Sequence, residues 1–540
     1  MSDHLPELSV TLEKISAALA SNDIPQAVSL AREALDRGNE HPLLFNLRAL
    51  WFENQKQNRE ALADLRRAQK LAPDDPTVLN ALGLACARAD RMAEARGWFA
   101  DAIEREPRFA PAHFNHGWAS EELGDLDVAR ASFLAHTRLA PDHADPWSRL
   151  AALSARLGEW DAARTHAVHA LSLDPDHVTA RLALASCEAA AKNFAAARGV
   201  LDGILASARA SAVERALALG QKGDVLHAER DYDAAFESYA AGNRQIREIN
   251  LDRFTGPDVQ TIPQYLGWLL RYFEKSSPWT PAQAGFAPAR GHVFILGFPR
   301  SGTTLLEEAL AAHPGVVTTG EKDGLADSVL AFMGSPAHLD RFKNASPNTL
   351  EEYRAAYWRR LEEQGINAKD RILIDKQPYN TMKLPLIARL FPDARIVFAV
   401  RDPRDVVLSC FRRRFRMNAS NFELLTIEGG ARFYDSTMRL ADVLRSKLPL
   451  SVKQIRHEDL IADLPARLRE ICDFAAIPWV DTLTAFAQRP RERAIATPSA
   501  SQIVRGVNQE GVGQWRNYEH HLRGILPLLD PWAARFGYPL

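Results

Sequence analysis

The stretch GHVFILGFPRSGTTLL, residues 291–306, decides the fold of the second half of the chain. Its apolar run Val293–Leu296 predicts a short buried β-strand. The glycines and proline that follow predict a tight loop, and a helix is expected over Thr303–Leu310. A strand, a glycine-containing loop and a helix together aim backbone N–H groups and the positive end of a helix dipole at one point. The stretch therefore predicts an anion-binding loop, although a glycine loop of this kind can also be a plain tight turn.

The loop has the glycine spacing of a P-loop but lacks its lysine. Four residues separate Gly297 from Gly302, as in the P-loop pattern, whereas Thr303 stands where that pattern has lysine. An arginine, Arg300, lies inside the loop instead. The loop is therefore expected to bind a phosphate group, but not the usual Mg-nucleotide triphosphate. The side chains that add hydrogen-bond donors to it are those of Arg300, Ser301, Thr303 and Thr304.

Composition limits the classes of function. At 540 residues the chain is expected to form two to four domains, and its charged and apolar fractions are those of an ordinary soluble protein. A net charge of −2 gives no support to a protein that binds nucleic acid by bulk electrostatics. The N-terminus lacks a signal-peptide pattern, and no run approaches 18 apolar residues, so we expect a cytoplasmic protein with no membrane span. The cysteines match no metal spacing, so buried thiols and no metal site are expected.

The N-terminal half repeats with a period of 34 residues. Small residues recur at this period, and a second small residue stands twelve positions earlier, as Gly83 does before Ala95. The prolines that mark the period are Pro73, Pro107, Pro141 and Pro175. This is the tetratricopeptide pattern, in which small residues allow two helices to cross closely. It predicts an all-α solenoid of about seven repeats over residues 8–250.

The repeats admit two functions. A tetratricopeptide solenoid can present a concave groove to a peptide or partner protein, or it can be a scaffold that orders the second half or makes a dimer. The alanine-rich pattern reveals how the helices pack but not what they bind. A homo-oligomer therefore stays open.

Beyond the repeats, residues 251–290 are predicted to form a capping helix and a linker, and residues 291–540 a second domain. Short apolar runs in the second domain alternate with helical patterns, which predicts an α/β P-loop-like domain with a mainly parallel sheet. The four predicted strands lie within residues 293–296, 371–375, 394–400 and 450–460. In such sheets the ligand lies beyond the carboxyl ends of the strands.

Charged and polar residues follow the predicted strands at that edge. Asp375 and Lys376 end the second strand, and Arg401 ends the third, with Ser409 eight residues further on. An arginine and a hydroxyl can hold a second phosphate. Each residue also has a plainer reading, because Arg401 could pair with its neighbour Asp402 and Lys376 could be a solvated surface lysine.

The motifs PRSGTTLL and RDPRDVVLS together resemble the sulfotransferase superfamily, and within it the protein-tyrosine sulfotransferases. The resemblance covers roughly residues 290–520, and bacterial chains with N-terminal tetratricopeptide repeats share this architecture. It implies 3′-phosphoadenosine 5′-phosphosulfate (PAPS) as the sulfuryl donor, with the first loop on the 5′-phosphosulfate and the Arg401–Ser409 pair on the 3′-phosphate. It implies no metal, since sulfuryl transfer develops less charge than γ-phosphoryl transfer.

The resemblance also assigns roles to single residues. Glu321, which lies 21 residues after Arg300 in HPGVVTTGE, matches the family's general base. The residues implied in catalysis are Glu321, Lys376, Arg300 and Ser499. Those implied in donor binding are Arg300, Ser301, Gly302, Thr303, Thr304, Arg401, Ser409, Arg413, His457, Ser499, Gln502 and Asn508. By itself, Glu321 could also be a helix-start glutamate.

The sequence departs from the family pattern at two positions. His457 stands where the tyrosine enzymes have a nucleotide-contacting tyrosine, and Gln514 stands where a lysine is expected. Both departures put the cofactor contacts in question. The acceptor stays open: an acceptor hydroxyl is expected, with peptide tyrosine as one candidate held by the repeat groove, beside glycan, lipid or a small phenol. The alternatives are a catalytically silent nucleotide-binding scaffold and a P-loop kinase, although the kinase requires a lysine at position 303.

Overall fold

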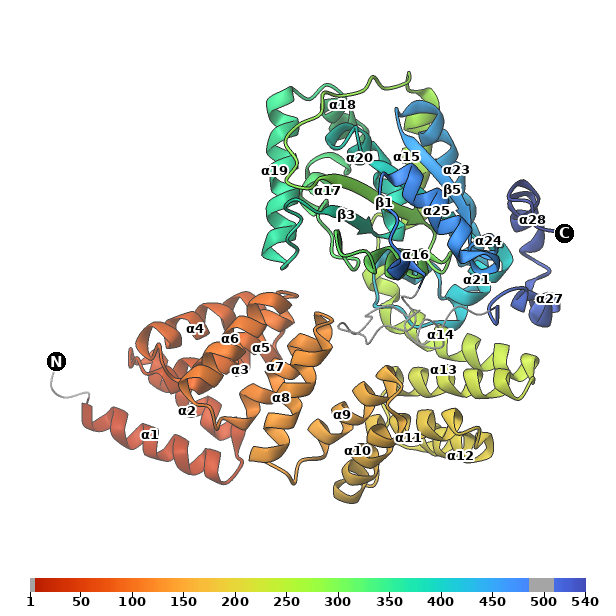
Figure 1. Cartoon of the computed structure of the whole chain (residues 1–540). Coiled ribbons are helices and arrows are strands. Elements are labelled where there is room, and N and C mark those ends of the chain that lie inside the picture. Colours follow the sequence, from red (N-terminus) through yellow and green to blue (C-terminus); the bar gives the residue numbers. More distant parts are fainter. Residues whose placement is uncertain (1–4, 485–508) are drawn as a thin grey trace. The chain divides into compact units, whose positions relative to one another are not determined.

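The computed structural model describes residues 5–484 and 509–540 and divides into two compact units, Met1–Cys187 and Glu188–Leu540 (Figure 1). The first unit is built entirely of helices in its described part. Its helices are α1 (Leu5–Ala20), α2 (Ile24–Asp36), α3 (Pro42–Asn54), α4 (Asn58–Leu71), α5 (Pro76–Arg88), α6 (Met92–Arg105), α7 (Ala110–Glu122), α8 (Leu126–Leu139), α9 (Ala144–Leu157), α10 (Trp160–Leu173) and α11 (Val178–Ala190), the last of which ends just inside the second unit.

The backbone conformation of the turn inside each helix pair repeats with the same period as the sequence. One residue of each turn adopts a left-handed conformation, with φ between 58° and 83°. These residues are Asn22, Lys56, Asp90, Gly124, Gly158, Lys192 and Arg230. A left-handed residue is a common way to end a helix. The first six are spaced by 34 residues, which confirms the predicted period, and the last step is four residues longer.

The small residues mark the points where paired helices touch, as the pattern predicts. A Cβ atom built on Gly83 would lie 2.4 Å from the ring of Phe99, and one on Gly117 would lie 2.8 Å from the ring of Phe133. Both phenylalanines are fully buried. A side chain at either glycine would therefore displace the aromatic ring that fills the repeat core. The tetratricopeptide fold of the first half is confirmed.

The second unit begins with further helices and continues into a five-stranded sheet. The helices before the sheet are α12 (Phe194–Ala206), α13 (Ala212–Ala228), α14 (Tyr232–Thr255) and α15 (Ile262–Lys275). The strands are β1 (Gly291–Gly297), β2 (Val316–Thr318), β3 (Ile372–Lys376), β4 (Arg395–Val400) and β5 (Ser451–Arg456). Every pairing in the order β2-β3-β1-β4-β5 is parallel, which confirms the predicted α/β class.

The central strand β1 shows why this sequence makes a buried parallel sheet. Successive side chains of a strand point to opposite faces. Val293 and Ile295 join one apolar cluster, whereas Phe294 and Leu296 join the other. Because both faces are covered, the strand is apolar throughout, as expected for a parallel sheet between two layers of helices. The first cluster includes residues of α16 (Thr303–Ala311) and α25 (Leu464–Ala475), and the second includes residues of α15 and α23 (Ile427–Lys447).

The segment between repeats and sheet belongs to the core of the second unit. Helix α15 packs against α23, and its Leu269 and Phe273 are fully buried. Beyond it, the backbone N–H of Trp279 donates a hydrogen bond to the carbonyl of Lys447, 2.7 Å away. The predicted capping helix is therefore a structural part of the α/β domain.

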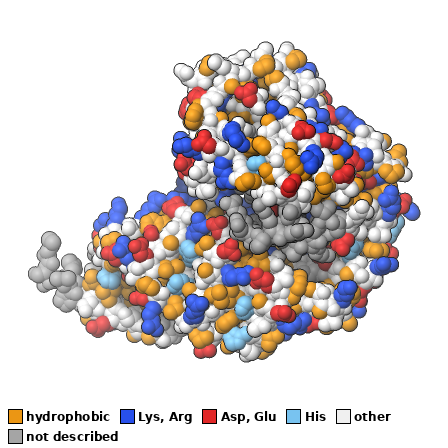
Figure 2. All heavy atoms as spheres, viewed as in Figure 1, with side chains coloured by type: hydrophobic (Ala, Val, Ile, Leu, Met, Phe, Trp, Pro, Cys, Tyr) orange, Lys and Arg blue, Asp and Glu red, His pale blue; other side chains and the backbone are white. Residues whose placement is uncertain are grey.

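The remaining helices surround the sheet. They are α16 (Thr303–Ala311), α17 (Ala326–Phe332), α18 (Pro336–Lys343), α19 (Pro347–Glu363), η1 (Pro378–Lys383), α20 (Leu384–Leu390), α21 (Pro403–Arg412), α22 (Ala419–Glu423), α23 (Ile427–Lys447), α24 (His457–Ala462), α25 (Leu464–Ala475), η2 (Asp481–Leu483), η4 (Gln514–Tyr518), α27 (Glu519–Leu522) and α28 (Leu526–Arg535). Among the described helices, none has the length and apolar character to cross a bilayer. On the face shown in Figure 2, acidic and basic side chains are interspersed with hydrophobic ones.

Candidate active site

The loop between β1 and α16 has the backbone of an anion-binding site. Arg300 adopts φ 70° and Gly302 adopts φ 92°, so two of three consecutive residues have a left-handed backbone conformation. For a residue with a side chain, this conformation costs about 1–3 kcal/mol, and such strain gathers at functional sites. Ser301, Thr303 and Thr304 are buried around the N-terminus of α16. The helix start and its free N–H groups therefore face the loop.

His457 lies directly against this loop. It is the first residue of α24, immediately after β5. A Cβ atom on Gly302 would lie 2.5 Å from His457 Nδ1, so only glycine permits this approach. Burial, together with the charges of Arg401 and Arg300, lowers the pKa of His457 to about 3. The imidazole is therefore neutral at pH 7.

Two arginines close the other side of the loop. The Arg300 side chain donates a hydrogen bond from Nε to Ser409 Oγ at 3.0 Å. Arg401, just after β4, donates from Nη1 to the carbonyl of Arg300 at 3.2 Å and from Nη2 to the carbonyl of Gly511. Burial, together with the neighbouring guanidinium groups of Arg413 and Arg401, lowers the pKa of Arg300 to about 9. Positive charge is concentrated here.

The polar atoms of this basic side leave hydrogen-bonding capacity unused. In the described part of the chain, Arg401 Nε and His457 Nδ1 are both buried without a hydrogen-bond partner. Buried polar atoms are normally paired, so unpaired atoms call for an explanation. Two orphaned nitrogens beside a helix N-terminus and several guanidinium groups fit an anionic ligand.

A lysine between two carboxylates forms the second part of the site. Lys376 ends β3, and its side chain is fully buried. Its Nζ lies 3.2 Å from Glu307 Oε2 and donates a hydrogen bond to Glu321 Oε1. Burial alone would lower the pKa of Lys376, but the two carboxylates outweigh burial and raise it. The group is therefore a buried ammonium ion.

The two glutamates differ in exposure. Glu307 is buried, and burial raises its pKa, an effect that Lys376 opposes. Glu321 keeps 35% of its side chain exposed, so it can meet a molecule arriving from solvent. Its backbone is also left-handed, with φ 70° directly after Gly320 at φ 58°. The Gly320 N–H donates to Glu307 Oε1 at 3.1 Å, which fixes this turn.

A buried polar chain supports the strand end that carries the lysine. Asp375 accepts hydrogen bonds from the Tyr357 hydroxyl at 2.8 Å and from Asn380 Nδ2 at 3.2 Å. His292 Nε2 lies 3.0 Å from the same hydroxyl. Burial raises the pKa of Asp375 to about 7. These contacts hold the backbone next to Lys376.

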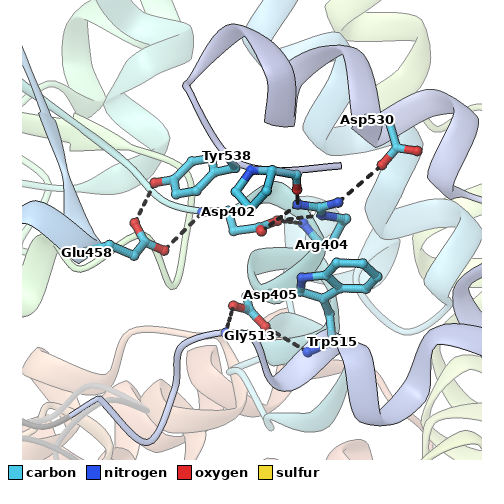
Figure 3. A network of polar contacts seen from close by, with 9 residues as sticks. Asp402, Arg404, Asp405, Glu458, Gly513, Trp515, Asp530 and Tyr538 are labelled. Carbon is cyan, nitrogen blue, oxygen red and sulfur yellow. Dashed lines mark hydrogen bonds and ion pairs between the residues drawn. The ribbon is translucent and has the colours of Figure 1, made fainter.

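The segment after β4 is held by a network that Figure 3 shows. Asp402 caps α21 and accepts two hydrogen bonds from the fully buried side chain of Arg404, at 2.9 and 2.8 Å. The Arg404 guanidinium lies 4.1 Å from the centre of the Trp515 ring and donates to the carbonyl of Pro539 at 2.6 Å. The turn that positions Arg401 is thereby tied to the last residues of the chain.

Besides Asp530, which lies 3.6 Å from Arg404 Nη1, two further carboxylates belong to this network (Figure 3). Asp405 accepts the backbone N–H groups of Gly513 and Trp515 at 2.6 and 2.8 Å. Glu458, on α24 beside His457, accepts the Asp402 N–H at 3.3 Å and the Tyr538 hydroxyl at 2.5 Å. The network therefore places Arg401 and His457 relative to each other through the C-terminal segment.

Comparison with known proteins now adds the family. Residues 292–481 match the model of the sulfotransferase family. The C-terminal domain is a sulfotransferase domain. Models of the tetratricopeptide repeat match residues 12–76, 48–108, 99–144 and 156–220. The chain thus combines tetratricopeptide repeats with a sulfotransferase domain.

Curated relatives match mainly the sulfotransferase domain at low identity. An uncharacterized protein of Aquifex aeolicus is 24% identical over 57% of this chain, and the match spans 40% of that protein. Protein-tyrosine sulfotransferase A of Caenorhabditis elegans is 26% identical over 47% of this chain and 69% of its own length. Among solved structures, the pilus biogenesis factor PilW is 22% identical over 38% of this chain and 94% of its own, with a TM-score of 0.33.

The structure brings most of the predicted residues of the sulfotransferase domain together. The loop residues 300–304, Arg401, Ser409 and His457 gather on the basic side, and Lys376 and Glu321 form the acidic side. Lys376 is buried, so the surface-lysine reading is wrong. Gln514 donates to the carbonyl of Glu510 at 2.6 Å. The predicted residues Ser499, Gln502 and Asn508 lie outside the described part of the chain.

Arg413, a predicted donor-binding residue, and Glu307, which was not predicted, both have partners that the sequence did not indicate. Arg413 extends to Asp224 of α13, with Nη1 3.3 Å from Oδ2. Glu307, the buried partner of Lys376, was not among the predicted site residues. Its position contains a signal, because Glu307 lies three and four residues after the buried Thr304 and Thr303 and so shares their helix face.

Proposed function

We propose that this protein transfers a sulfuryl group from PAPS to an acceptor hydroxyl. The observation that carries the proposal is the arrangement at one edge of the sheet. The carboxyl ends of β1, β3 and β4 bring an anion loop, the Lys376–Glu321 pair and Arg401 to a single site. The family of the domain supports the same reaction class.

The donor would bind along the basic side. The loop that contains Arg300 would hold the 5′-phosphosulfate with backbone N–H groups and the α16 N-terminus. Arg401, Ser409 and Arg413 would hold the 3′-phosphate, and the unpaired nitrogens of Arg401 and His457 would find acceptors on the donor. All these groups donate hydrogen bonds or carry positive charge, as binding a polyanion requires.

The reaction would then run between the two sides of the site. Glu321 accepts the proton of the acceptor hydroxyl while that oxygen forms a new bond to sulfur. The bond between sulfur and the 5′-phosphate oxygen breaks, and adenosine 3′,5′-bisphosphate leaves. Lys376 and Arg300 stabilise the charge on the transferred and leaving groups. Proton acceptance by a placed carboxylate typically contributes about 10²–10⁴-fold in rate.

For the acceptor we propose a tyrosine in a peptide or protein. Two observations favour this class over glycan, lipid or a small phenol. Relatives of the domain carry the name protein-tyrosine sulfotransferase, and tetratricopeptide repeats commonly bind peptides in their groove. The repeat array would then recruit the acceptor protein.

One experiment tests reaction and acceptor together. The full chain is incubated with sulfur-labelled PAPS and a cell extract, and protein, glycan and lipid fractions are counted separately. We expect label in the protein fraction, with turnover reduced about 10²–10⁴-fold by Glu321→Gln. The matched control is Glu363→Gln, which changes an exposed glutamate on α19 and should leave turnover intact. Label confined to glycan or lipid would replace the peptide proposal, and wild-type turnover by Glu321→Gln would remove Glu321 as base.

A binding measurement separates the alternatives. Stabilisation of the protein by adenosine 3′,5′-bisphosphate without added Mg²⁺ is expected from thermal unfolding. Stabilisation that appears only with Mg-ATP would favour a kinase. Binding of the bisphosphate without label transfer to any fraction would favour a silent nucleotide-binding scaffold.

A further inference from the structure

The last helix pair of the repeat array packs against the nucleotide side of the sulfotransferase domain. Helices α13 and α14 belong to the same compact unit as the sheet. Asn243 Nδ2 donates to the carbonyl of Phe411 at 2.9 Å in a buried contact. Arg414 donates to Asn243 Oδ1 at 3.1 Å and to the carbonyl of Ala216 at 2.5 Å. Residues 411–414 begin two positions after Ser409 along the chain, so this repeat contacts the segment that carries Arg413.

The last repeat breaks the array's own pattern at this contact. The position after the small residue of the first helix is uncharged in the earlier repeats but is Asp224 in the last. The earlier residues at this position are Leu50, Leu84, Trp118, Ala152 and Ser186. The core position sixteen residues after the small residue is also apolar earlier but is Tyr239 in the last. Those earlier residues are Leu65, Phe99, Phe133, Ala167 and Leu201.

Tyr239 and Asp224, the two residues that depart from the repeat pattern, lie beside Arg412 and Arg413. The ring of Tyr239 packs against Gly223, where an added Cβ atom would lie 2.5 Å from the ring. Phe99 and Phe133 pack against the corresponding glycines of two earlier repeats in the same way. The Tyr239 hydroxyl, which those phenylalanines lack, donates to Asp224 Oδ1 at 2.7 Å. Asp224 then meets two guanidinium groups, with Oδ2 3.3 Å from Arg413 Nη1 and Oδ1 3.9 Å from Arg412 Nη2.

The carboxylate stands beside a dense group of positive charges. Arg300 and Arg401 are joined through the loop backbone, and the charges of Arg412 and Arg413 act on Arg300 together with that of Arg401. Four guanidinium groups in one region repel one another unless anions lie among them. Arg413 is 28% exposed at its side chain and Asp224 is 42% exposed, so an incoming phosphate can compete for the same arginine.

We infer that Asp224 is a built-in counter-ion for the donor-binding arginines, placed by Tyr239, and that it sets the affinity of the site for the 3′-phosphate. The inference rests on the proposed function, because it takes Arg413 as a 3′-phosphate contact. Without donor, the carboxylate offsets the charge of Arg412 and Arg413. When the 3′-phosphate binds, Arg413 turns from one anion to the other, and the remaining carboxylate repels the phosphate. Asp224 is thus a positioning residue that links the last repeat to the donor site.

The test is Asp224→Asn, which removes the charge and keeps the shape. We expect the ligand-free variant to unfold at a lower temperature than wild type, whereas its affinity for adenosine 3′,5′-bisphosphate rises about three- to tenfold. Its affinity for adenosine 5′-monophosphate, which lacks the 3′-phosphate, should not change. Asp224→Glu should restore wild-type behaviour. The matched control is Asp202→Asn on α12, which breaks a 2.6 Å ion pair with Lys222 away from the arginines.

The outcomes separate the inference from the proposed function. If wild type and variant both fail to bind the bisphosphate, the proposed function fails. If wild type binds and Asp224→Asn binds equally or more weakly, the inference fails, because a merely structural aspartate would lower stability and affinity together. An equal gain in affinity for the 5′-monophosphate would also contradict it. Calorimetric titration and thermal unfolding of the full chain give all these values.

Discussion

The two sides of the candidate site handle charge in opposite ways. On the basic side, guanidinium groups crowd around a helix N-terminus, and buried nitrogens of Arg401 and His457 have no hydrogen-bond partner in the described chain. On the acidic side, Lys376 is held by two carboxylates. The first side therefore has the positive charge and the unpaired nitrogens that an anionic ligand would require. On the second side the ammonium already has two carboxylate partners, and these groups are suited to accepting a proton or meeting a developing charge.

The largest effect is expected on the acidic side, from Lys376→Met. The change removes the lysine charge that would stabilise the transition state, and it leaves the buried Glu307 without its cation. Turnover should fall by about 10³-fold or more, and the free energy of unfolding by about 3–5 kcal/mol. Label transfer from PAPS and urea unfolding measure the two quantities. Lys383→Met is the control, since its 2.8 Å pair with Asp323 is partly exposed and should cost about 1 kcal/mol or less. Turnover within tenfold of wild type would contradict the role of Lys376.

On the basic side, Arg401→Ala should act on binding more than on turnover at saturating donor. The change removes charge-assisted hydrogen bonds, each worth about 1.5–3 kcal/mol, so affinity for adenosine 3′,5′-bisphosphate should fall about 10–100-fold. Calorimetric titration measures it. Arg395→Ala, at the other end of β4, is the matched control and should leave affinity unchanged. An unaltered dissociation constant for Arg401→Ala would show that Arg401 does not bind the bisphosphate, and the contrast between the two sides would then be wrong.

A smaller effect is expected from Gly302→Ala. The new methyl group would meet His457 Nδ1 at 2.5 Å and would sit on a left-handed backbone. We expect about 1–3 kcal/mol of lost stability and weaker donor binding. Gly365→Ala is the control: its φ is 80°, but nothing lies within 4 Å of its Cβ position. Because both changes share the backbone cost, any difference between the two reports the contact with His457. Equal behaviour of the two variants would argue against that contact.

The last effect depends on pH and is absent near neutrality. The folded pKa of His457 is about 3, below the ordinary value of 6.5, so the unfolded chain takes up this proton first on acidification. Stability from this group is present above pH 6.5 and is lost as the pH falls towards 3, by up to about 1.4 kcal/mol per pH unit. His457→Gln should flatten the curve of unfolding free energy against pH by that amount. His292, whose pKa burial also lowers to about 3, keeps its own contribution in both proteins. An unchanged slope would show that folding does not lower the pKa of His457.

Much of this architecture could be predicted because the decisive signals are local. The 34-residue period needs only the spacing of small residues, and the strand, loop and helix around Gly302 lie within one short stretch. Strand β2 was missed because three residues, Val316–Thr318, carry no recognisable periodicity. The four longer strands were all anticipated within a residue or two at their starts.

What escaped prediction depends on contacts between distant parts of the chain. Asp405 binds the backbone of Trp515, 110 residues away, and Arg413 meets Asp224, 189 residues away. No spacing rule links such pairs, since they arise only when the sheet order and helix packing are known. Glu307 is the intermediate case. Its helix face was readable, but its partner Lys376 on another element was not.

The sheet order has a last consequence, for solubility. Strands β2 and β5 form the two ends of the five-stranded order, and an end strand offers unpaired N–H and C=O groups to any passing chain. At one end, β2 is only three residues long, so little backbone is on offer. At the other, β5 reads SVKQIR, and its Lys453 is paired with Glu470 at 3.4 Å. A short strand at one edge and a charged side chain at the other are common protections against edge-to-edge aggregation, and both are found in this sheet.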